Sequence, residues 1–145
     1  MLVTDACVVV KMFVPETDSA KAEALAESDM PLALPEHGLG EVLEILRRKV
    51  GAGELEASSY WEVVGALAPG FQKSPLTPLL NDAAEISLET GVSVYDALYL
   101  AQAASLGTRV LTSDVKMLRK LRGSRFERLA IDLASWDPPR ASAFP

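Results

Sequence analysis

The sequence contains almost none of the residues that build disulfides and soft metal sites. It has one cysteine, Cys7, and one histidine among 145 residues. A lone cysteine forms no internal disulfide, and one cysteine with one histidine provides too few ligands for a structural zinc site. Because Cys7 lies within an apolar run, we expect it to be a small, buried hydrophobic residue.

The sequence also lacks an apolar run of membrane-spanning length, and no basic region precedes a long apolar segment near residue 1. We therefore expect a cytoplasmic protein without a cleaved signal peptide and without membrane association. Positive charge is scarce as well, because the net charge is −6 and the isoelectric point is about 4.8. This balance argues against nonspecific nucleic-acid binding driven by total charge.

The basic residues that are present gather in two places. Residues 109–128 contain seven Lys and Arg residues against two acidic ones, so this segment has a net charge of +5. A shorter cluster consists of Arg47, Arg48 and Lys49. Such clusters are either solvated helix faces or surfaces for an anionic partner, and the sequence leaves both alternatives open.

The length favours one domain over residues 1–145, because a chain of this size buries one core and leaves no room for a second. Apolar runs alternate with segments of helical periodicity, which indicates crossover connections. The predicted class is α/β, with a central, mostly parallel sheet between two layers of helices. We expect strands at 1–14, 30–34, 109–112 and 126–133, helices at 18–28, 36–49, 54–67, 79–89, 94–106 and 115–121, a strand or loop at 71–78, and a proline-rich tail after 133.

Asp5 is an anomaly within the first apolar run. Residues 1–14 are rich in valine and bounded by Pro15, a pattern typical of a buried strand. A carboxylate there loses hydration and needs a positive or hydrogen-bonding partner. Either Asp5 ends a short strand and caps the following turn, or it lies at the carboxyl edge of a central strand, where open α/β sheets bind ligands.

An acidic residue also lies at the edge of the apolar stripe in the helix expected at 36–49. On a helical wheel Glu41 falls about 40° from Ile45, so its side chain can point across the end of the sheet. Glu44 satisfies this criterion nearly as well. Periodicity alone favours the simpler interpretation, that Glu41 is an ordinary exposed helix residue.

Two further aspartates lie at expected helix starts. Asp96 follows Ser93 by three residues, which is close to a capping box. Asp114 follows the strand expected at 109–112 and can be the cap of the basic helix after it. Capping alone explains each aspartate without a function.

Together, however, these acidic residues predict a metal site. A parallel sheet brings residues that follow its strands, and residues on the flanking helices, to one edge. Carboxylates that converge there repel one another and take up protons unless a divalent cation binds between them. Mg²⁺ or Mn²⁺ suits hard oxygen ligands in the absence of histidine and cysteine.

Four segments carry a resemblance to a known family. The most specific is the string Tyr-Asp-Ala-Leu-Tyr-Leu-Ala at 95–101, and the others are 3–13, 39–43 and 111–114. In this order, and over essentially the full length, the chain resembles the PIN-domain ribonucleases. It looks most like the VapC toxins of prokaryotic toxin–antitoxin pairs. The resemblance implies a PIN-like fold over residues 1–145.

The resemblance also implies an activity, the metal-dependent endonucleolytic cleavage of single-stranded or looped RNA. The acidic positions of the family correspond to Asp5, Glu41, Asp96 and Asp114. We expect Asp5, Asp96 and Asp114 to be ligands of Mg²⁺ or Mn²⁺, and Glu41 to be a ligand or a general base. Thr112 matches a hydroxyl position that contacts the metal ligands without binding the metal itself.

RNA and protein partners follow from the same resemblance. Because four carboxylates repel a phosphate backbone, cations must hold it, and the candidates are Lys116, Arg119 and Lys120. Family members are typically homodimers that a small antitoxin inhibits by covering the active-site groove. The segment 54–67, with Tyr60, Trp61 and Val64, belongs either to such a surface or to the core.

Some positions depart from the family pattern. Cys7 stands where relatives usually have serine, and Val115 and Lys116 follow Asp114 where a further acidic residue is common, so the number of metals stays open. Cys7 also disfavours a haloacid dehalogenase-type phosphohydrolase, which needs a second aspartate there. Two alternatives remain, a PIN-type nuclease of RNA maturation or structured DNA, and a catalytically weak PIN-fold regulatory protein.

Overall fold

Five short strands, all parallel, form the centre of the fold in the computed structural model, which describes residues 1–139. Their order is β3-β2-β1-β4-β5, so β1 lies between β2 and β4 in the middle of the sheet. The parallel sheet predicted from the alternating pattern is confirmed. The strands are β1 (Leu2–Thr4), β2 (Leu32–Pro35), β3 (Gln72–Ser74), β4 (Val110–Thr112) and β5 (Ala130–Asp132).

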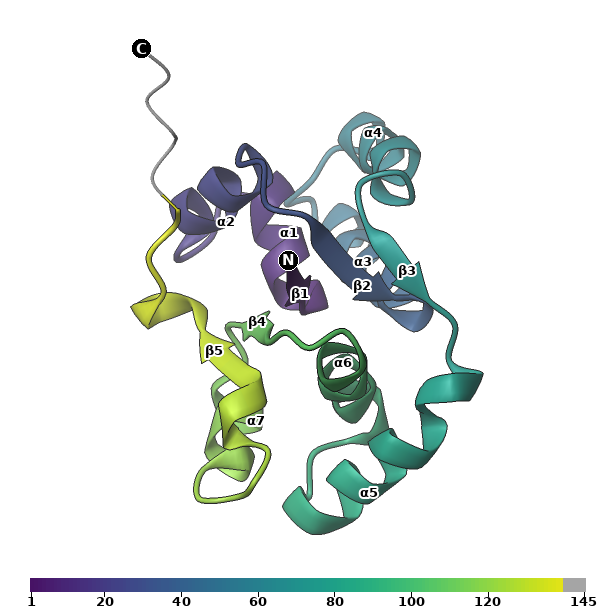
Figure 1. Cartoon of the computed structure of the whole chain (residues 1–145). Coiled ribbons are helices and arrows are strands. Elements are labelled where there is room, and N and C mark those ends of the chain that lie inside the picture. The colour runs from purple at the N-terminus through teal and green to yellow at the C-terminus, as the bar shows by residue number, and fades with distance from the viewer. Residues whose placement is uncertain (140–145) are drawn as a thin grey trace.

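Helices cover both faces of the sheet, so the predicted three-layer arrangement is confirmed as well (Figure 1). On one face lie α1 (Ala6–Phe13), α2 (Ser19–Ala26) and α4 (Ala57–Leu67), seen above the strands in Figure 1, and α3 (Glu36–Gly51), seen behind β2 and β3. On the other face lie α5 (Leu80–Thr90), α6 (Val94–Ser105) and α7 (Val115–Leu121). Within residues 1–139, no helix combines the length and apolar character that a bilayer crossing requires.

Helix α6 is deeply buried and positions one end of the sheet. All seven residues from Ala97 to Ala103 are buried, and the helix packs against β1 and β2 on one side and against α5 on the other. Tyr99, near its centre, has no exposed surface. Because α6 cannot shift without disturbing this core, its first turn, which contains Asp96, is held firmly in place.

The first apolar run is not one long strand. β1 ends at Thr4 and α1 begins at Ala6, so the prediction of a strand over 1–14 is wrong after residue 4. The backbone N–H groups of Val8 and Val9 donate to the Asp5 carbonyl, which starts the helix. These two valines are fully buried in two different core clusters. A helix buried on several sides has a continuous apolar sequence, which periodicity does not distinguish from a buried strand.

The other element boundaries agree with the predictions to within a few residues, and 71–78 contains β3. The strand predicted at 126–133 is the exception, because only Ala130–Asp132 pairs with β4 and short 3₁₀ turns flank it. β4 has three residues, so a longer β5 would find no further backbone partners on that side. The proline-rich tail falls partly on residues 140–145, which lie outside the described residues.

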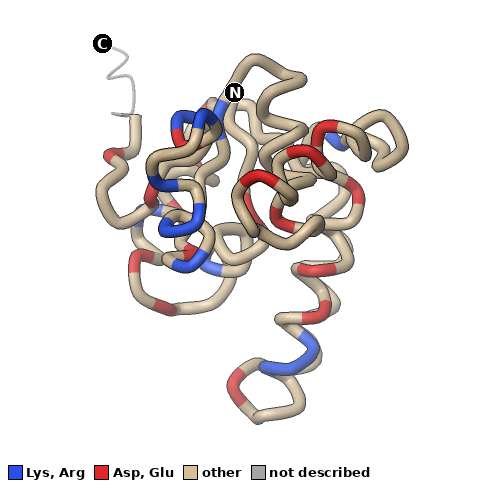
Figure 2. The backbone as a smooth tube through the Cα atoms, turned by 90° about the horizontal axis from the view of Figure 1, so that it is seen from below, with Lys and Arg blue, Asp and Glu red and all other residues tan. Residues whose placement is uncertain are grey.

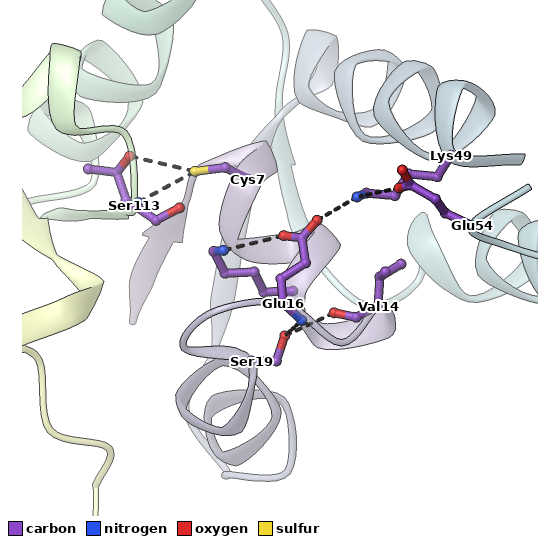
Figure 3. Close-up of polar contacts among 9 residues, drawn as sticks. Cys7, Val14, Glu16, Ser19, Lys49, Glu54 and Ser113 are labelled. Carbon is purple, nitrogen blue, oxygen red and sulfur yellow. Dashed lines mark hydrogen bonds and ion pairs between the residues drawn. The ribbon is translucent and has the colours of Figure 1, made fainter. Parts of the chain in front are cut away.

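Basic and acidic side chains are segregated among the helices. Lys and Arg gather along α7, whereas the charged residues of α5 are all acidic (Figure 2). At the end of α3, Arg47 and Arg48 pair with Glu44 at 2.6 and 3.5 Å. Lys49 Nζ lies 2.6 Å from Glu16 in the loop after α1 (Figure 3). The shorter basic cluster is therefore a paired helix face.

Candidate active site

Thr112 joins the two strand ends that carry Asp5 and Asp114. Because β1 and β4 pair through Thr4 and Leu111, Asp5 lies beside Thr112. The Asp5 backbone N–H donates to the Leu111 carbonyl at 3.0 Å. The Thr112 hydroxyl donates to Asp5 Oδ2 at 2.7 Å and accepts from the Asp114 backbone N–H at 3.0 Å. One buried hydroxyl therefore fixes how the two aspartates lie relative to each other.

The Asp5 carboxylate is buried but does not cap a helix. Asp5 precedes α1, yet its side chain makes no capping hydrogen bond and the residue is only 6% exposed. Its location at the carboxyl edge of the central strand is confirmed. Burial raises the pKa of Asp5, whereas its hydrogen bonds with Thr112 and Cys7 lower it. A carboxylate desolvated in this way favours either protonation or a bound cation.

Cys7 contacts the same hydroxyl as Asp5. Its Sγ lies 3.7 Å from Thr112 Oγ1 and accepts from the Ser113 backbone N–H at 3.5 Å (Figure 3). Cys7 is half-buried and its sulfur takes part in polar contacts, so its description as a buried hydrophobic residue is only partly right. Burial, followed by the Asp5 charge, raises the pKa of the Cys7 thiol to about 12. The thiol therefore stays protonated at neutral pH.

Glu41, and not Glu44, points toward the buried side of α3. Tyr99 Oη donates to Glu41 Oε2 at 2.7 Å, and His37 Nε2 lies 3.6 Å from Glu41 Oε1. Glu44 is exposed, and hydrogen bonds from Arg47 lower its pKa to about 2. The periodicity of α3 left both glutamates open, and their contacts with other side chains decide between them.

Gly38 makes room for the hydroxyl that reaches Glu41. A Cβ atom at position 38 would lie 2.9 Å from Tyr99 Oη and 2.7 Å from Leu34 Cδ1, closer than packed atoms approach. Sequence analysis missed Gly38, His37 and Tyr99 as supports of the site. The only sequence signal for two of them was helical spacing. Tyr99 follows Asp96 by three residues and His37 precedes Glu41 by four, so each lies on the same helix face as a predicted site residue.

Asp96 and Asp114 both lie at helix starts, as predicted. The Ser93 hydroxyl accepts from the Asp96 backbone N–H at 3.1 Å. Asp114 Oδ1 accepts from the backbone N–H groups of Lys116 and Met117 at 2.9 and 3.1 Å, so it caps α7. Capping leaves Asp114 Oδ2 without a hydrogen bond among the contacts recorded for residues 1–139.

The four carboxylates lie close enough for their charges to interact. The Glu41 and Asp114 charges add to the effect of burial on the Asp5 pKa. Burial, then the charges of Asp5 and Asp114, raise the pKa of Asp96 to about 6. Within the described chain, none of the three aspartates forms an ion pair with Lys or Arg, and no three His, Cys, Asp or Glu side chains converge as a preformed metal cage. The result is a concentration of negative charge with which no Lys or Arg of residues 1–139 forms a direct ion pair.

Among the predicted RNA-binding cations, Lys120 has contacts that tie it to this cluster. Its Nζ donates to the Gly91 carbonyl at 3.0 Å, and its charge lowers the Asp96 pKa against the larger effect of burial. Lys116 and Arg119 belong to the same helix, α7, but the recorded contacts of their side chains do not reach the carboxylates. Lys120 is therefore the best-placed of the three.

Helix α4 has a buried side and an exposed aromatic residue. Val63 and Leu67 face the core, whereas Trp61 is 68% exposed and Tyr60 packs against it with ring centroids 5.6 Å apart. Core packing therefore does not account for Trp61. The alternative for this segment, a surface that contacts another protein, stays a prediction.

Comparisons with known proteins agree with this architecture. Residues 2–123 match the family described as PIN domain. Ribonuclease VapC3 of Pyrobaculum aerophilum is 31% identical over 122 residues, which cover 82% of this chain and 93% of that protein. A toxin–antitoxin complex from Klebsiella pneumoniae shares the fold, with a TM-score of 0.66 and 16% identity over 92% of this chain and 98% of that one. So does the structure of FitAB bound to an IR36 DNA fragment, with a TM-score of 0.67 and 14% identity over 94% and 98%. The chain belongs to the PIN-domain family.

Proposed function

We propose that this protein is a metal-dependent endoribonuclease, the toxin of a type II toxin–antitoxin pair, that hydrolyses RNA phosphodiester bonds. The observation that carries the proposal is the buried Asp5 carboxylate, whose pKa is raised by burial and by the charges of Glu41 and Asp114. Membership of the PIN-domain family and the similarity to Ribonuclease VapC3 support a nuclease. The toxin–antitoxin complex among the structures of the same fold supports an inhibitory partner.

Mg²⁺ or Mn²⁺ fits this set of oxygen donors. Mg²⁺ uses one or two carboxylates and keeps several waters, so a cage of three converging side chains is not required. We assign Asp5, Asp96 and Asp114 as the ligands that would hold the ion, one or two of them directly and the rest through its waters, and Glu41 as a further ligand or general base. When bound, such an ion supplies Lewis-acid stabilisation of the phosphodiester and of its leaving oxygen.

The protein's own residues orient the reacting groups. Thr112 holds Asp5 Oδ2 and the Asp114 backbone, so the two carboxylates keep one relative position. Tyr99 holds Glu41 Oε2 at 2.7 Å and leaves Oε1 to accept a proton from the attacking water. Since these contacts exist before substrate binds, the site loses little energy to reorganisation during the reaction.

The proposal is tested with purified protein and a mixed pool of single-stranded RNA. We expect cleavage with Mg²⁺ or Mn²⁺ and none with EDTA, and sequencing of the products identifies the cleaved bonds. A matched pool of single-stranded DNA serves as the control for substrate class. Absence of both RNA cleavage and Mg²⁺ binding by calorimetry would instead favour the catalytically weak regulatory protein.

The proposed partners are tested by separate measurements. We expect a homodimer, and a small antitoxin that covers the site and blocks cleavage. The exposed side chain of Trp61 supports the proposal that α4 belongs to one of these surfaces. Light scattering of the purified protein reports the oligomeric state, and a gene for a small DNA-binding protein directly upstream would supply the antitoxin to test.

Replacing Tyr99 with Phe should lower kcat by about 10–100-fold with little change in KM, the usual range for residues that orient ligands from behind. The substitution removes only the hydroxyl that donates to Glu41. Single-turnover cleavage kinetics measure the effect, and Tyr60→Phe on α4 is the matched control. An unchanged kcat would show that Glu41 does not need this hydrogen bond.

Reversing the charge of Lys120 should weaken RNA binding by about tenfold at low salt and reduce the salt dependence of binding by about one ion. Metal binding should persist, because Lys120 is not a ligand. Fluorescence anisotropy with labelled RNA across a salt series measures both quantities. Lys73→Glu makes the same charge change on β3, where Nζ also donates to a backbone carbonyl, and should have a smaller effect.

A further inference from the structure

We infer that the cavity beside Glu41 is a subsite for one unpaired nucleobase of the RNA, an inference that rests on the proposed function. The cavity has a volume of about 540 Å³, within the range of sites for small organic groups. It lies between α3 and the first turn of α6. Its lining includes His37, Gly40, Glu41, Ile45, Arg48 and Tyr95.

Tyr95 supplies a stacking surface at this cavity. Its side chain is 65% exposed, although the next residue is Asp96. His37 braces it, because His37 Nε2 lies 3.0 Å from the Tyr95 carbonyl oxygen and the two ring centroids are 6.2 Å apart. His37 packs in turn against the buried Tyr99 ring at 4.9 Å. A nucleobase can therefore stack on the exposed Tyr95 ring. Because His37 already holds the backbone at this point, the protein loses little conformational entropy when the base binds.

The cavity shares one residue, Glu41, with the carboxylate cluster. Glu41 lines it and also accepts the hydrogen bond from Tyr99, so a base in the cavity lies next to the proposed general base. Arg48, at another point of the lining, contacts Glu44 through Nε alone at 3.5 Å, so its terminal nitrogens can still donate to a flanking phosphate. These neighbours are the ones that a nucleotide adjacent to the scissile bond would meet.

Two features favour a planar base over a basic side chain of a protein partner. The carboxylate of Glu44, which also lines the cavity, is already engaged by Arg47 and Arg48. Gly40 leaves the wall open, because a Cβ atom there would meet nothing within 4 Å. The cavity thus combines an aromatic face with an open wall, and of its two lining carboxylates Glu44 is paired with arginine and Glu41 accepts a hydrogen bond from Tyr99. Stacking of this kind tolerates every base, so the subsite should discriminate weakly by sequence.

The test compares labelled octamers of adenylate, of cytidylate and of abasic ribose phosphate by fluorescence anisotropy, with Ca²⁺ in place of Mg²⁺. The wild type should bind both base-containing octamers about 5- to 140-fold more tightly than the abasic one, which is the contribution of one stacked base. Tyr95→Ala should remove most of this difference and Tyr95→Phe should keep it. Gly40→Leu, which fills the cavity, should act like Tyr95→Ala. Phe13→Ala removes an exposed aromatic residue at the end of α1, outside the cavity, and should change nothing.

The outcomes separate this inference from the proposed function. Equal binding of all octamers by the wild type, or a base dependence that survives in Tyr95→Ala, overturns the subsite even where Mg²⁺-dependent cleavage is intact. Base-dependent binding that persists in Tyr95→Ala would instead favour a protein partner as the ligand of this cavity. Base-dependent binding through Tyr95 without any cleavage of the RNA pool would support the subsite and count against the nuclease.

Discussion

Replacing Asp5 with Asn should reduce RNA cleavage by about 10³-fold or more, the scale seen when one member of a catalytic constellation is removed. The same substitution should stabilise the metal-free protein. Burial raises the pKa of Asp5, so at neutral pH its charge opposes folding, whereas an amide carries no charge. The Thr112 hydroxyl, 2.7 Å from Oδ2, still finds an acceptor in the Asn side chain. We expect a melting temperature about 2–6 °C higher in EDTA.

The control is Asp132→Asn. Asp132 ends β5, as Asp5 follows β1, but its Oδ1 accepts from the Ala134 backbone N–H at 3.0 Å and caps a 3₁₀ turn. Asparagine keeps that cap, so cleavage and melting temperature should stay near those of the wild type. Loss of cleavage together with a lower melting temperature in Asp5→Asn would indicate damage to the fold instead of loss of a ligand.

The predictable parts of the site were those that depend on local sequence. Ser93 and Asp96 are three residues apart, and the capping contact they predict is present. Asp114 follows a strand and precedes a helix, and it caps α7 as that order suggests. Adjacent parallel strands have their carboxyl ends at the same edge of the sheet. Because β1 pairs with β4, Asp5 and Asp114, which follow these strands, lie near each other. The capping patterns and the parallel strand order were therefore enough to predict that these aspartates lie at one edge of the sheet.

The parts that could not be predicted depend on contacts between distant segments. Glu41 and Glu44 are nearly equivalent on the wheel of α3, and the Tyr99 hydroxyl, 58 residues away, distinguishes them. The requirement for glycine at position 38 arises from that same hydroxyl. Valines 8 to 10 favour a strand locally, yet they form α1, because a helix buried against the sheet and its neighbouring helices accommodates them equally well.

The pH dependence of stability should reveal Asp96 in the metal-free protein. Burial, and then the charges of Asp5 and Asp114, raise its pKa in the folded protein from the ordinary value of 3.8 to about 6. A carboxyl group with a raised folded pKa contributes stability that is fully present below the unfolded pKa and is lost as the pH rises through the folded pKa. The window is therefore between about pH 4 and pH 7. Because Asp96 is half-buried, solvent screening limits this loss of stability to about 1–2 kcal/mol.

Asp96→Asn isolates this effect from the other groups that titrate over the same range. Wild type and variant should have similar stabilities near pH 4, and the variant should become the more stable by about 2–6 °C near pH 7.5 in EDTA. Mg²⁺ should then raise the melting temperature of the wild type more than that of the variant, because a cation that binds only the folded state stabilises it through its ligands. Asp82→Asn, in the first turn of α5, is the exposed control and should show no such divergence. Parallel stability curves for wild type and Asp96→Asn across this range would remove Asp96 from the charge cluster and, with it, from the proposed metal ligands.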